Sequence, residues 1–274
     1  MTTNRQNTRR NNFSFDFRAR KKPISKVIKG LPVDYKDVDV LISYEEGEYI
    51  EDISEYRHFS KKKSISLAKI KNTDFEDNLW NSKKRENIDD YREYYSRNVH
   101  YLERQDYYNL NHLNILSEFR YLKTNANILD YGCGTAALSL KAKKKRIDLN
   151  LFLADIPEAI TKDYVFWRFK KYNLDFVWID IPKDEKIIQP FKYDLIRCHD
   201  VLEHSFYPMK IIKYFYDNLK DDGYLSYDYI KSDKIEKEVT KESQDSREEF
   251  MDFVNKKFEF IYSFRNKYVV KKKK

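Results

Sequence analysis

Length, composition and charge already exclude several classes of protein. The 274 residues include 36% charged and 16% aromatic side chains, and the mean hydropathy is −0.83, so the chain can form a core but is largely solvated. No run approaches about eighteen apolar residues and no apolar signal region opens the chain, so we expect neither a membrane span nor a secretory leader. Because Cys133 and Cys198 lack metal-ligand spacing, we predict a reduced, cytoplasmic protein without a metal site.

The excess of positive over negative charge lies entirely in the first 30 residues. This arm carries nine basic residues and one acidic residue, whereas the rest of the chain has 44 of each sign. It is rich in Asn, Thr and Arg and lacks apolar periodicity, so we predict a largely disordered arm over 1–30. Such an arm favours RNA or an acidic surface through counterion release, and a purely solubilising tail is the equal alternative.

The next segment, 31–87, reads as a small unit followed by a polar linker from about Asn72 to Glu86. Residues 88–108 are dense in tyrosine, and the spacing of Tyr91, Tyr94 and Tyr95 predicts one side of a helix. These tyrosines either form a lid over a ligand or simply pack one helix on the next. Leu110, Leu113, Leu116 and Phe119 recur at every third position and predict a second helix, which polar residues end at Thr124-Asn125.

Strand and helix signals alternate from Asn127 onward. We predict strands near 127–131, 150–154, 175–179, 193–198 and 223–229, and helices near 135–145, 157–171, 205–220 and 240–256. This alternation is typical of βαβ units, and therefore of a three-layer, mostly parallel α/β sheet. Two β-rich runs around Arg265-Asn266 predict an antiparallel hairpin at the C-terminal edge of that sheet.

Polar residues that could bind a ligand or take part in catalysis follow successive predicted strands. The stretch Ile128–Ala136 ends a strand in Asp130 and a tight turn with Gly132 and Gly134, two of only five glycines in the chain. Asp155 and Asp180 follow the next two strands, and the segment from His199 to His204 follows the fourth. Because an open parallel sheet binds its ligand beyond the carboxyl ends of its strands, these residues predict one site, and an acid after the second strand suits ribose hydroxyls.

At these residues the chain resembles the class I S-adenosylmethionine-dependent methyltransferases, over about 110–270. The motifs are Ile128–Thr135, Ala154–Ile160, Tyr193–His204 and Leu219–Leu225, in the family's order. The resemblance implies a Rossmann-like methyltransferase domain over 88–274, with a helical lid at its N-terminal end and S-adenosyl-L-methionine as cofactor. It implies a cofactor site that comprises Asp130, Gly132 and Gly134 at the amino-acid end, Asp155 and Ile156 at the ribose, Asp180 at the adenine, and His199 and Asp200 near the methyl group.

Catalysis needs an aligned acceptor and, for an oxygen or nitrogen acceptor, a base. His204 and Glu203 are the candidates at the mouth of the site, since histidine changes charge near neutral pH. A helix-start residue bonded to backbone is the simpler interpretation of His204. Cys133 is placed as a packing residue rather than a nucleophile. A dinucleotide-binding enzyme is disfavoured because its glycine fingerprint needs a third glycine, which is absent here, and because it would leave the later motifs unexplained.

A second resemblance covers about residues 18–71. The stretch Val33–Leu41, with basic residues on both sides, looks like the small-subunit ribosomal protein eighteen of bacteria. The Arg-rich turn of that family is replaced by acids, so a short helix and an acidic loop packed on the larger domain remain the alternative. The leading function is methyl transfer to an oxygen or nitrogen of a small polar acceptor, and the alternatives are a ribosome- or RNA-directed methyltransferase and a non-catalytic cofactor-binding module.

Overall fold

The computed structural model describes residues 48–69, 87–97, 101–105, 119, 122–185, 187, 191–229, 239–264 and 267–274. All of these belong to one compact unit, Lys36–Lys274. The predicted arm over 1–30, the linker from Asn72 to Glu86, and the leucine-rich helix before Phe119 therefore lie outside the described residues. Within the described ranges, no helix is both long and apolar enough to cross a membrane.

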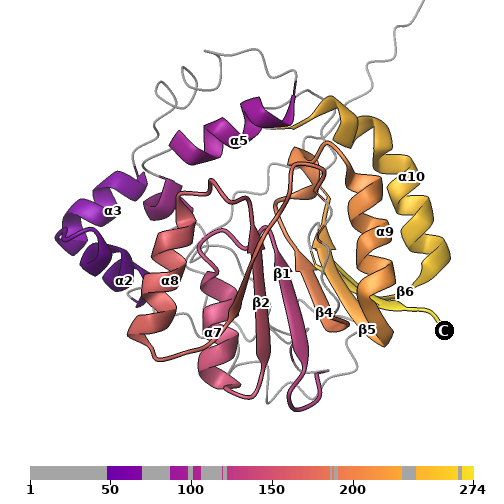
Figure 1. Ribbon diagram of the computed structural model, residues 1–274, viewed down its shortest axis with the longest axis horizontal. Coiled ribbons are helices and arrows are strands. Elements are labelled where there is room, and N and C mark those ends of the chain that lie inside the picture. The colour runs from indigo at the N-terminus through magenta and orange to yellow at the C-terminus, as the bar shows by residue number, and fades with distance from the viewer. Residues whose placement is uncertain are drawn as a thin grey trace, which may run out of the picture. The chain divides into compact units, whose positions relative to one another are not determined.

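The elements alternate as the sequence predicted (Figure 1). In chain order they are α2 (Glu48–Tyr56), α3 (Lys61–Lys69), α5 (Ile88–Arg97), β1 (Asn127–Tyr131), α7 (Ala137–Lys145), β2 (Asn150–Asp155), α8 (Thr161–Lys171), β3 (Val177–Asp180), β4 (Tyr193–Cys198), the 3-10 turn η5 (Leu202–His204), α9 (Pro208–Asn218), β5 (Leu219–Asp228), α10 (Lys241–Lys257), β6 (Phe258–Phe264) and β7 (Lys267–Lys272).

The described strands form one sheet in the order β3-β2-β1-β4-β5-β7-β6. Strands β1 to β5 run parallel, and β7 pairs antiparallel with both β5 and β6. The strand order reverses between β1 and β4, so a ligand site is expected beyond the carboxyl ends of these two strands. The predicted Rossmann-like α/β fold with an antiparallel C-terminal hairpin is confirmed.

Alternating side chains of each strand serve two cores. Leu129 of β1 and Ile196 of β4 pack with apolar residues of α9 and α10 on one face of the sheet. Ile128 and Leu195, one residue earlier in each strand, pack with apolar residues of α7 and α8 on the other face. Both faces of a parallel sheet are buried by its crossover helices, which explains why these strands read as continuous apolar runs.

Several elements begin a few residues away from the predicted positions, and three of these differences have a local explanation. Helix α7 begins at Ala137 because Ala136 is left-handed, with φ of 50°. Helix α8 begins at Thr161 rather than 157, after a turn that closes with the Ala159 N–H donating to the Ile156 carbonyl. Strand β5 begins at Leu219 rather than 223, so the acidic pair before Gly223 lies inside a strand that an irregularity interrupts.

The expected acidic loop is wrong, because its acids lie on a helix. Helix α2 packs on α8, with Ile50 and Ile53 against Tyr164 and Leu102 (Figure 1). Asp52 on the same helix is buried, and its carboxylate accepts from Arg168 Nε at 2.8 Å. The helix therefore carries apolar residues and one buried, paired acid toward α8, and the exposed Glu55 pairs with Lys171 of α8.

Candidate cofactor and acceptor site

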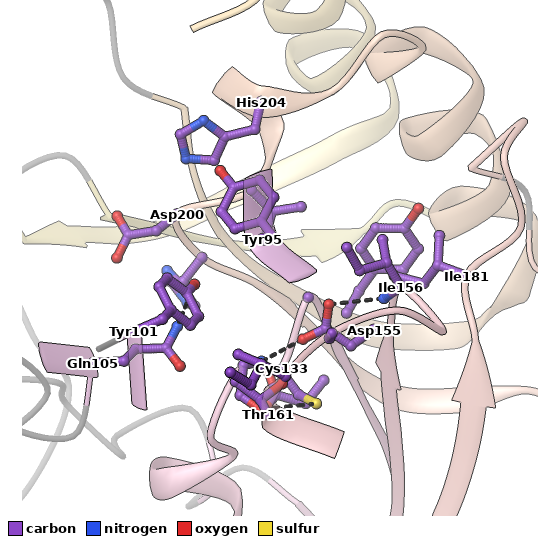
Figure 2. A pocket seen from close by; sticks show the side chains of 18 of the residues that line it. Tyr95, Tyr101, Gln105, Cys133, Asp155, Ile156, Thr161, Ile181, Asp200 and His204 are labelled. Carbon is purple, nitrogen blue, oxygen red and sulfur yellow. Dashed lines mark hydrogen bonds between the residues drawn. The ribbon is translucent and has the colours of Figure 1, made fainter. Parts of the chain in front are cut away.

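A cavity of about 320 Å³ opens where β1, β2 and β4 end (Figure 2). His204 and Tyr95 lie at the top of this view, Cys133 and Thr161 at the bottom, and Asp155 between them. Its wall also includes Gly132, Gly134, Asp130, Ile156, His199 and Asp200. Most of the residues predicted for the site are therefore brought together, from segments far apart in the sequence.

The glycine turn is held by the neighbouring strand. The N–H groups of Gly132 and Cys133 donate to the Ala154 carbonyl at 2.8 and 3.0 Å, and the Gly134 N–H donates to Asp155 Oδ2 at 2.8 Å. Gly132 has φ of +71°, and a Cβ atom there would lie 2.3 Å from a methyl carbon of Val201. Glycine is therefore required at position 132 both by backbone conformation and by space.

Asp155 faces the cavity from the end of β2. Its second oxygen accepts the N–H of Ile156 at 2.8 Å, so the carboxylate is oriented by two backbone donors. Burial raises its pKa to about 6, despite these two hydrogen bonds. Each carboxylate oxygen still has a free acceptor direction, so the group can accept hydroxyls of a ligand.

Asp130 lies beneath the turn and is 7% exposed. It accepts the hydroxyl of Ser139, and Arg197 Nη1 lies 3.3 Å from the same oxygen. Arg197 is itself buried and lines the cavity. This ion pair places one anion and one cation at the predicted amino-acid end of the cofactor site.

Asp180, predicted at the adenine, is not among the residues that line the cavity. Its carboxylate, with a side chain 51% exposed, accepts from Lys162 Nζ and from Trp178 Nε1, each at 2.8 Å. Lys162 and the indole hold the pKa of Asp180 below its usual range. Asp180 is the last residue of β3 and Ile181, the next residue, lines the cavity instead.

His199 and Asp200 both line the cavity after β4. The His199 ring lies between Asp228, 3.2 Å from Nδ1, and Ser226 Oγ, 2.9 Å from Nε2. Asp200 is exposed, has φ of +55°, and donates its N–H to Asp228 at 2.7 Å. Burial opposes the charge of Asp228, but His199 and Lys267 outweigh it and hold its pKa below the usual range.

The two predicted bases separate in the structure. His204, the last residue of η5, lines the cavity, and its ring centroid lies 6.1 Å from that of Tyr95. Glu203 was expected at the mouth, but its side chain is buried and does not line the cavity. A 3-10 turn directs successive side chains about 120° apart, so adjacent residues cannot share one direction. Burial raises the pKa of Glu203 to about 7.

The tyrosines of α5 both pack and line the cavity. Tyr91 and Tyr94 are buried, and Tyr91 meets Phe206 edge to face with ring centroids 5.0 Å apart. Tyr95 makes similar contacts with Tyr94 and, 5.9 Å away, with Tyr101. These rings line the same cavity as the glycine turn, so the two interpretations of the sequence are compatible.

Three further residues of the wall were not predicted. Arg92 is buried and donates from Nη2 to the carbonyls of Ile181 and Pro182, tying α5 to the end of β3. Gln105 accepts the Thr135 N–H at 2.8 Å, and Glu185 accepts the Ser205 hydroxyl and the Tyr207 N–H. Arg92 lies next to Tyr91 in the tyrosine-rich stretch, but its sequence position does not show that it would reach the end of β3.

Cys133 has no features of a nucleophile. Burial raises the pKa of its thiol well above the usual value, and the neighbouring carboxylates of Asp155 and Asp130 raise it further. The thiol therefore stays protonated at neutral pH, and only the thiolate reacts readily. Its partial burial among the apolar residues of α7 and α8 agrees with the predicted packing role.

A glycine turn after β1, an acid after β2 and a polar segment after β4, on a parallel sheet closed by an antiparallel hairpin, define the architecture of a class I methyltransferase. The sequence model of a family described as a methyltransferase domain matches residues 99–265, well over half of the chain. The chain therefore belongs to the methyltransferase domain family, and the predicted class of S-adenosylmethionine-dependent methyltransferases is confirmed.

Similar solved structures show low identity. TehB from Haemophilus influenzae is 17% identical with a TM-score of 0.49, over 67% of each chain. The N-methyltransferase NodS from Bradyrhizobium japonicum, crystallised with S-adenosyl-L-homocysteine, is 14% identical with a TM-score of 0.41, over 54% of this chain and 79% of its own. PKMT2 from Rickettsia typhi is 18% identical with a TM-score of 0.36. The matched region covers 38% of this chain and only 21% of PKMT2.

No curated protein sequence matches the chain. None of the comparisons supports the ribosomal resemblance, and the family match begins at residue 99, after the segment that carries it. Much of that segment, 18–47 and 70–71, lies outside the residues that the structure describes.

Proposed function

We propose that the chain transfers a methyl group from S-adenosylmethionine to an oxygen or nitrogen of a small polar acceptor. The observation that carries this proposal is the Asp155 carboxylate, which faces the cavity beside the glycine turn and is oriented by two backbone donors. A carboxylate held in this way offers fixed acceptors to the two ribose hydroxyls of a nucleoside. The cavity volume of about 320 Å³ lies at the lower end of the range of ligand pockets.

The residues of the wall fit the cofactor. Gly132 and Gly134 bring the backbone to the cavity without side chains, and we assign them with Asp130 to the amino-acid end. We assign Asp155 and Ile156 to the ribose, and His199 and Asp200 to the neighbourhood of the methyl group. Asp180 receives no role because its side chain is engaged with Lys162 and Trp178.

The sulfonium of S-adenosylmethionine supplies an activated methyl group. The contribution of the chain is then to align the acceptor, and proximity of this kind contributes about 7–11 kcal/mol to lowering a barrier. Tyr95, Tyr101 and His204 lie on the cavity wall, where they can contact an acceptor. We assign to His204 the acceptance of the acceptor's proton, because it is the candidate base whose side chain lines the cavity.

Calorimetry of S-adenosylmethionine binding tests the ribose assignment. Asp155→Asn keeps the shape of the side chain but removes its charge, and we expect the dissociation constant to rise by at least about tenfold, because a charge-assisted hydrogen bond contributes about 1.5–3 kcal/mol. Asp180→Asn is the matched control, since it changes an acid after the next strand that is outside the cavity wall. Equal effects of the two substitutions would contradict the assignment of Asp155.

Turnover tests the role of His204. A screen for transfer of a radiolabelled methyl group, with cell extract divided into RNA, protein and small-molecule fractions, identifies the acceptor class. With that acceptor, His204→Ala should reduce turnover by about 10²–10⁴-fold and leave cofactor affinity unchanged. Wild-type turnover in this variant would exclude the base role, and label in the RNA fraction would favour the RNA-directed alternative.

A further inference from the structure

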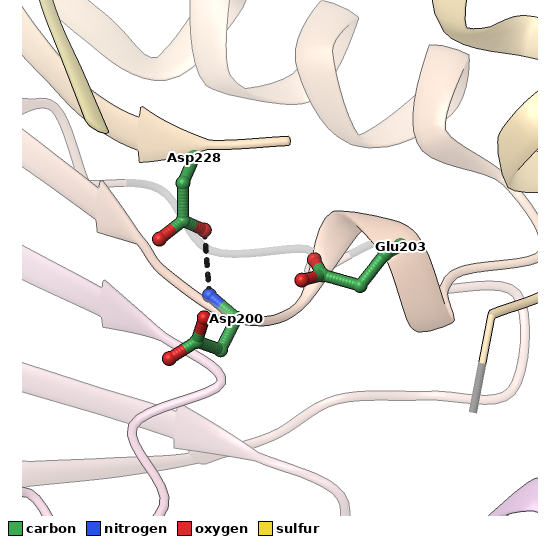
Figure 3. Close-up of side chains that lie close together, drawn as sticks. All are labelled: Asp200, Glu203 and Asp228. Atoms are coloured by element: carbon green, nitrogen blue, oxygen red, sulfur yellow. Dashed lines mark hydrogen bonds between the residues drawn. The ribbon is translucent and has the colours of Figure 1, made fainter. Parts of the chain in front are cut away.

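Three acidic side chains meet behind the cavity wall. Asp200 follows β4, Glu203 lies in η5 and Asp228 ends β5, and one carboxylate oxygen from each lies within 4.8 Å of the others (Figure 3). Asp200 is exposed and lines the cavity, whereas Glu203 and Asp228 are buried. The cluster therefore extends from the core to the surface of the cavity.

Glu203 makes this cluster more than a group of neighbouring acids. The residue is only 2% exposed, and its Oε2 atom accepts no hydrogen bond within the described part of the chain. Figure 3 shows its carboxylate directed toward the loop of Asp200 and the end of β5. Burying a carboxylate oxygen removes its hydration, and without a hydrogen-bond donor or a cation this free-energy cost is not offset. We therefore expect a binding partner for this oxygen.

Among the described residues, Asp228 is the member of the cluster that has a histidine and a lysine as neighbours. Asp228 is bonded to the His199 ring and to the Asp200 N–H, and Lys267 Nζ lies 4.0 Å from it. Among the residues that the structure describes, no lysine or arginine lies within ion-pair distance of Asp200 or Glu203. Asp200 and Glu203 therefore lie close to Asp228 and to each other with no lysine or arginine partner among the described residues.

We propose that Asp200, Glu203 and Asp228 bind a divalent cation at the wall of the cavity. Carboxylate oxygens are the ligands that Mg²⁺, Mn²⁺ and Ca²⁺ prefer. Oxygens up to 4.8 Å apart fit around Ca²⁺, whose ligand distances are about 2.3–2.6 Å, and a slight closing accommodates the smaller ions. A bound cation supplies the missing partner of Glu203.

The position of the cation suggests the class of acceptor, a step that rests on the proposed function. Because Asp200 lines the cavity, the remaining coordination positions of the cation face the same space as His204. An acceptor that carries two neighbouring oxygens can fill these positions, and coordination would fix its orientation. A cation at this position therefore favours oxygen-rich acceptors over amines.

The site is tested by titrating the full chain with Mn²⁺. Binding is measured as the loss of the electron paramagnetic resonance signal of the free ion. The protein is first treated with EDTA and desalted, and no methyl donor or acceptor is present. We expect one site that is occupied at or below about 1 mM Mn²⁺. Glu203→Gln and Asp200→Asn should each weaken binding by at least about tenfold, because each removes one charged ligand.

Glu249→Gln is the matched control, since it changes an exposed glutamate on α10 away from the cluster and should bind Mn²⁺ like the wild type. Absence of binding at about 1 mM, or equal binding by all three variants, would overturn the proposal. Far-UV circular dichroism confirms that Glu203→Gln folds, and the exposed Asp200 provides a second variant if it does not. Calorimetry of S-adenosylmethionine is run separately, so failure of the cation site and failure of the proposed function remain distinguishable.

Discussion

At the scale of single residues, the two glycines of the turn differ in what surrounds them. A Cβ atom at Gly132 would meet Val201, whose branched side chain is close to its own backbone, at 2.3 Å. At Gly134 it would meet the Gln105 amide at 2.4 Å, which is the far end of a flexible side chain. Both residues have positive φ, so both substitutions also carry a backbone cost of about 1–2 kcal/mol.

We therefore expect Gly132→Ala to destabilise the fold more than Gly134→Ala. The free energy of unfolding should fall by about 2–5 kcal/mol for the first, because overpacking of about 1–3 kcal/mol adds to the backbone cost, and by about 1–2 kcal/mol for the second. Urea unfolding followed by circular dichroism measures both. The reverse order would show that Val201 moves more readily than Gln105.

The raised pKa of Asp155 leads to a prediction of how cofactor affinity depends on pH. Its pKa is raised to about 6 in the folded chain, and only the ionised carboxylate accepts from both ribose hydroxyls. Affinity should be full well above pH 6 and should fall as the pH decreases through about 6, by about tenfold for each further unit. Calorimetry between pH 8 and pH 5 checks this, and Asp155→Asn should remove the dependence.

Unfolding does not explain that loss of affinity. A carboxyl whose folded pKa is above its unfolded value binds its proton more tightly in the folded state. Its protonation therefore stabilises the fold as the pH falls from about 6 toward about 4, its pKa in the unfolded chain. A circular dichroism spectrum that changes together with affinity in this window would contradict the role of Asp155.

At the scale of elements, α2 is joined to the glycine turn through one buried arginine. Asp52 accepts from Arg168 Nε at 2.8 Å, and Arg168 Nη1 donates to the Thr135 carbonyl at 3.4 Å. Burial opposes the charge of Asp52, but Arg168, Tyr172 and Lys171 together outweigh it and hold its pKa below the usual range. A helix from the N-terminal segment thus supports a loop of the candidate site.

Asp52→Asn should destabilise the chain strongly, because it leaves the fully buried Arg168 without its counter-charge. Breaking such a pair from one side costs about 3–5 kcal/mol, which denaturant unfolding can measure. Glu55→Gln on the same helix is the control. Its carboxylate is exposed and pairs with Lys171, so we expect a change of at most about 1 kcal/mol. A small effect of Asp52→Asn would mean that Arg168 finds another acceptor.

At the scale of the whole molecule, one sheet serves two cores. Leu195 and Ile196 are neighbours on β4, yet each is fully buried in a different core, one against α7 and α8 and the other against α9 and α10. Because both cores depend on the same strands, loss of either should unfold the whole sheet.

We expect Leu195→Ala and Ile196→Ala each to reduce the free energy of unfolding by about 2–5 kcal/mol. Far-UV and near-UV circular dichroism should report the same midpoint in each variant. Ile147→Ala, at a position 72% exposed, is the control and should change stability by at most about 0.5 kcal/mol. Separate transitions for the two spectral regions would show that the cores unfold independently.

The parts of the candidate site that short, continuous stretches of sequence encode could be predicted. Backbone conformation and strand ends are encoded by short stretches, so the glycine turn, Asp155 and the His199–Asp200 pair could be placed before the structure was known. Glu203 and Asp180 do not line the cavity, because side-chain direction depends on the pitch of η5 and on competing partners such as Lys162. The acidic cluster was not predicted, since it unites two residues that follow β4 with the last residue of β5, and only the pairing of β4 with β5 brings these segments together.

The sequence by itself determined the order of elements, the parallel sheet with its antiparallel end, and the class of methyltransferase, because apolar periodicity and the glycine turn are local properties of the chain. Only the tertiary structure decided which polar groups face the cavity. Arg92, Gln105 and Glu185 join its wall through hydrogen bonds between distant segments, and Asp52 reaches Arg168 across more than a hundred residues. Such pairings depend on packing geometry, for which short sequence patterns carry no signal.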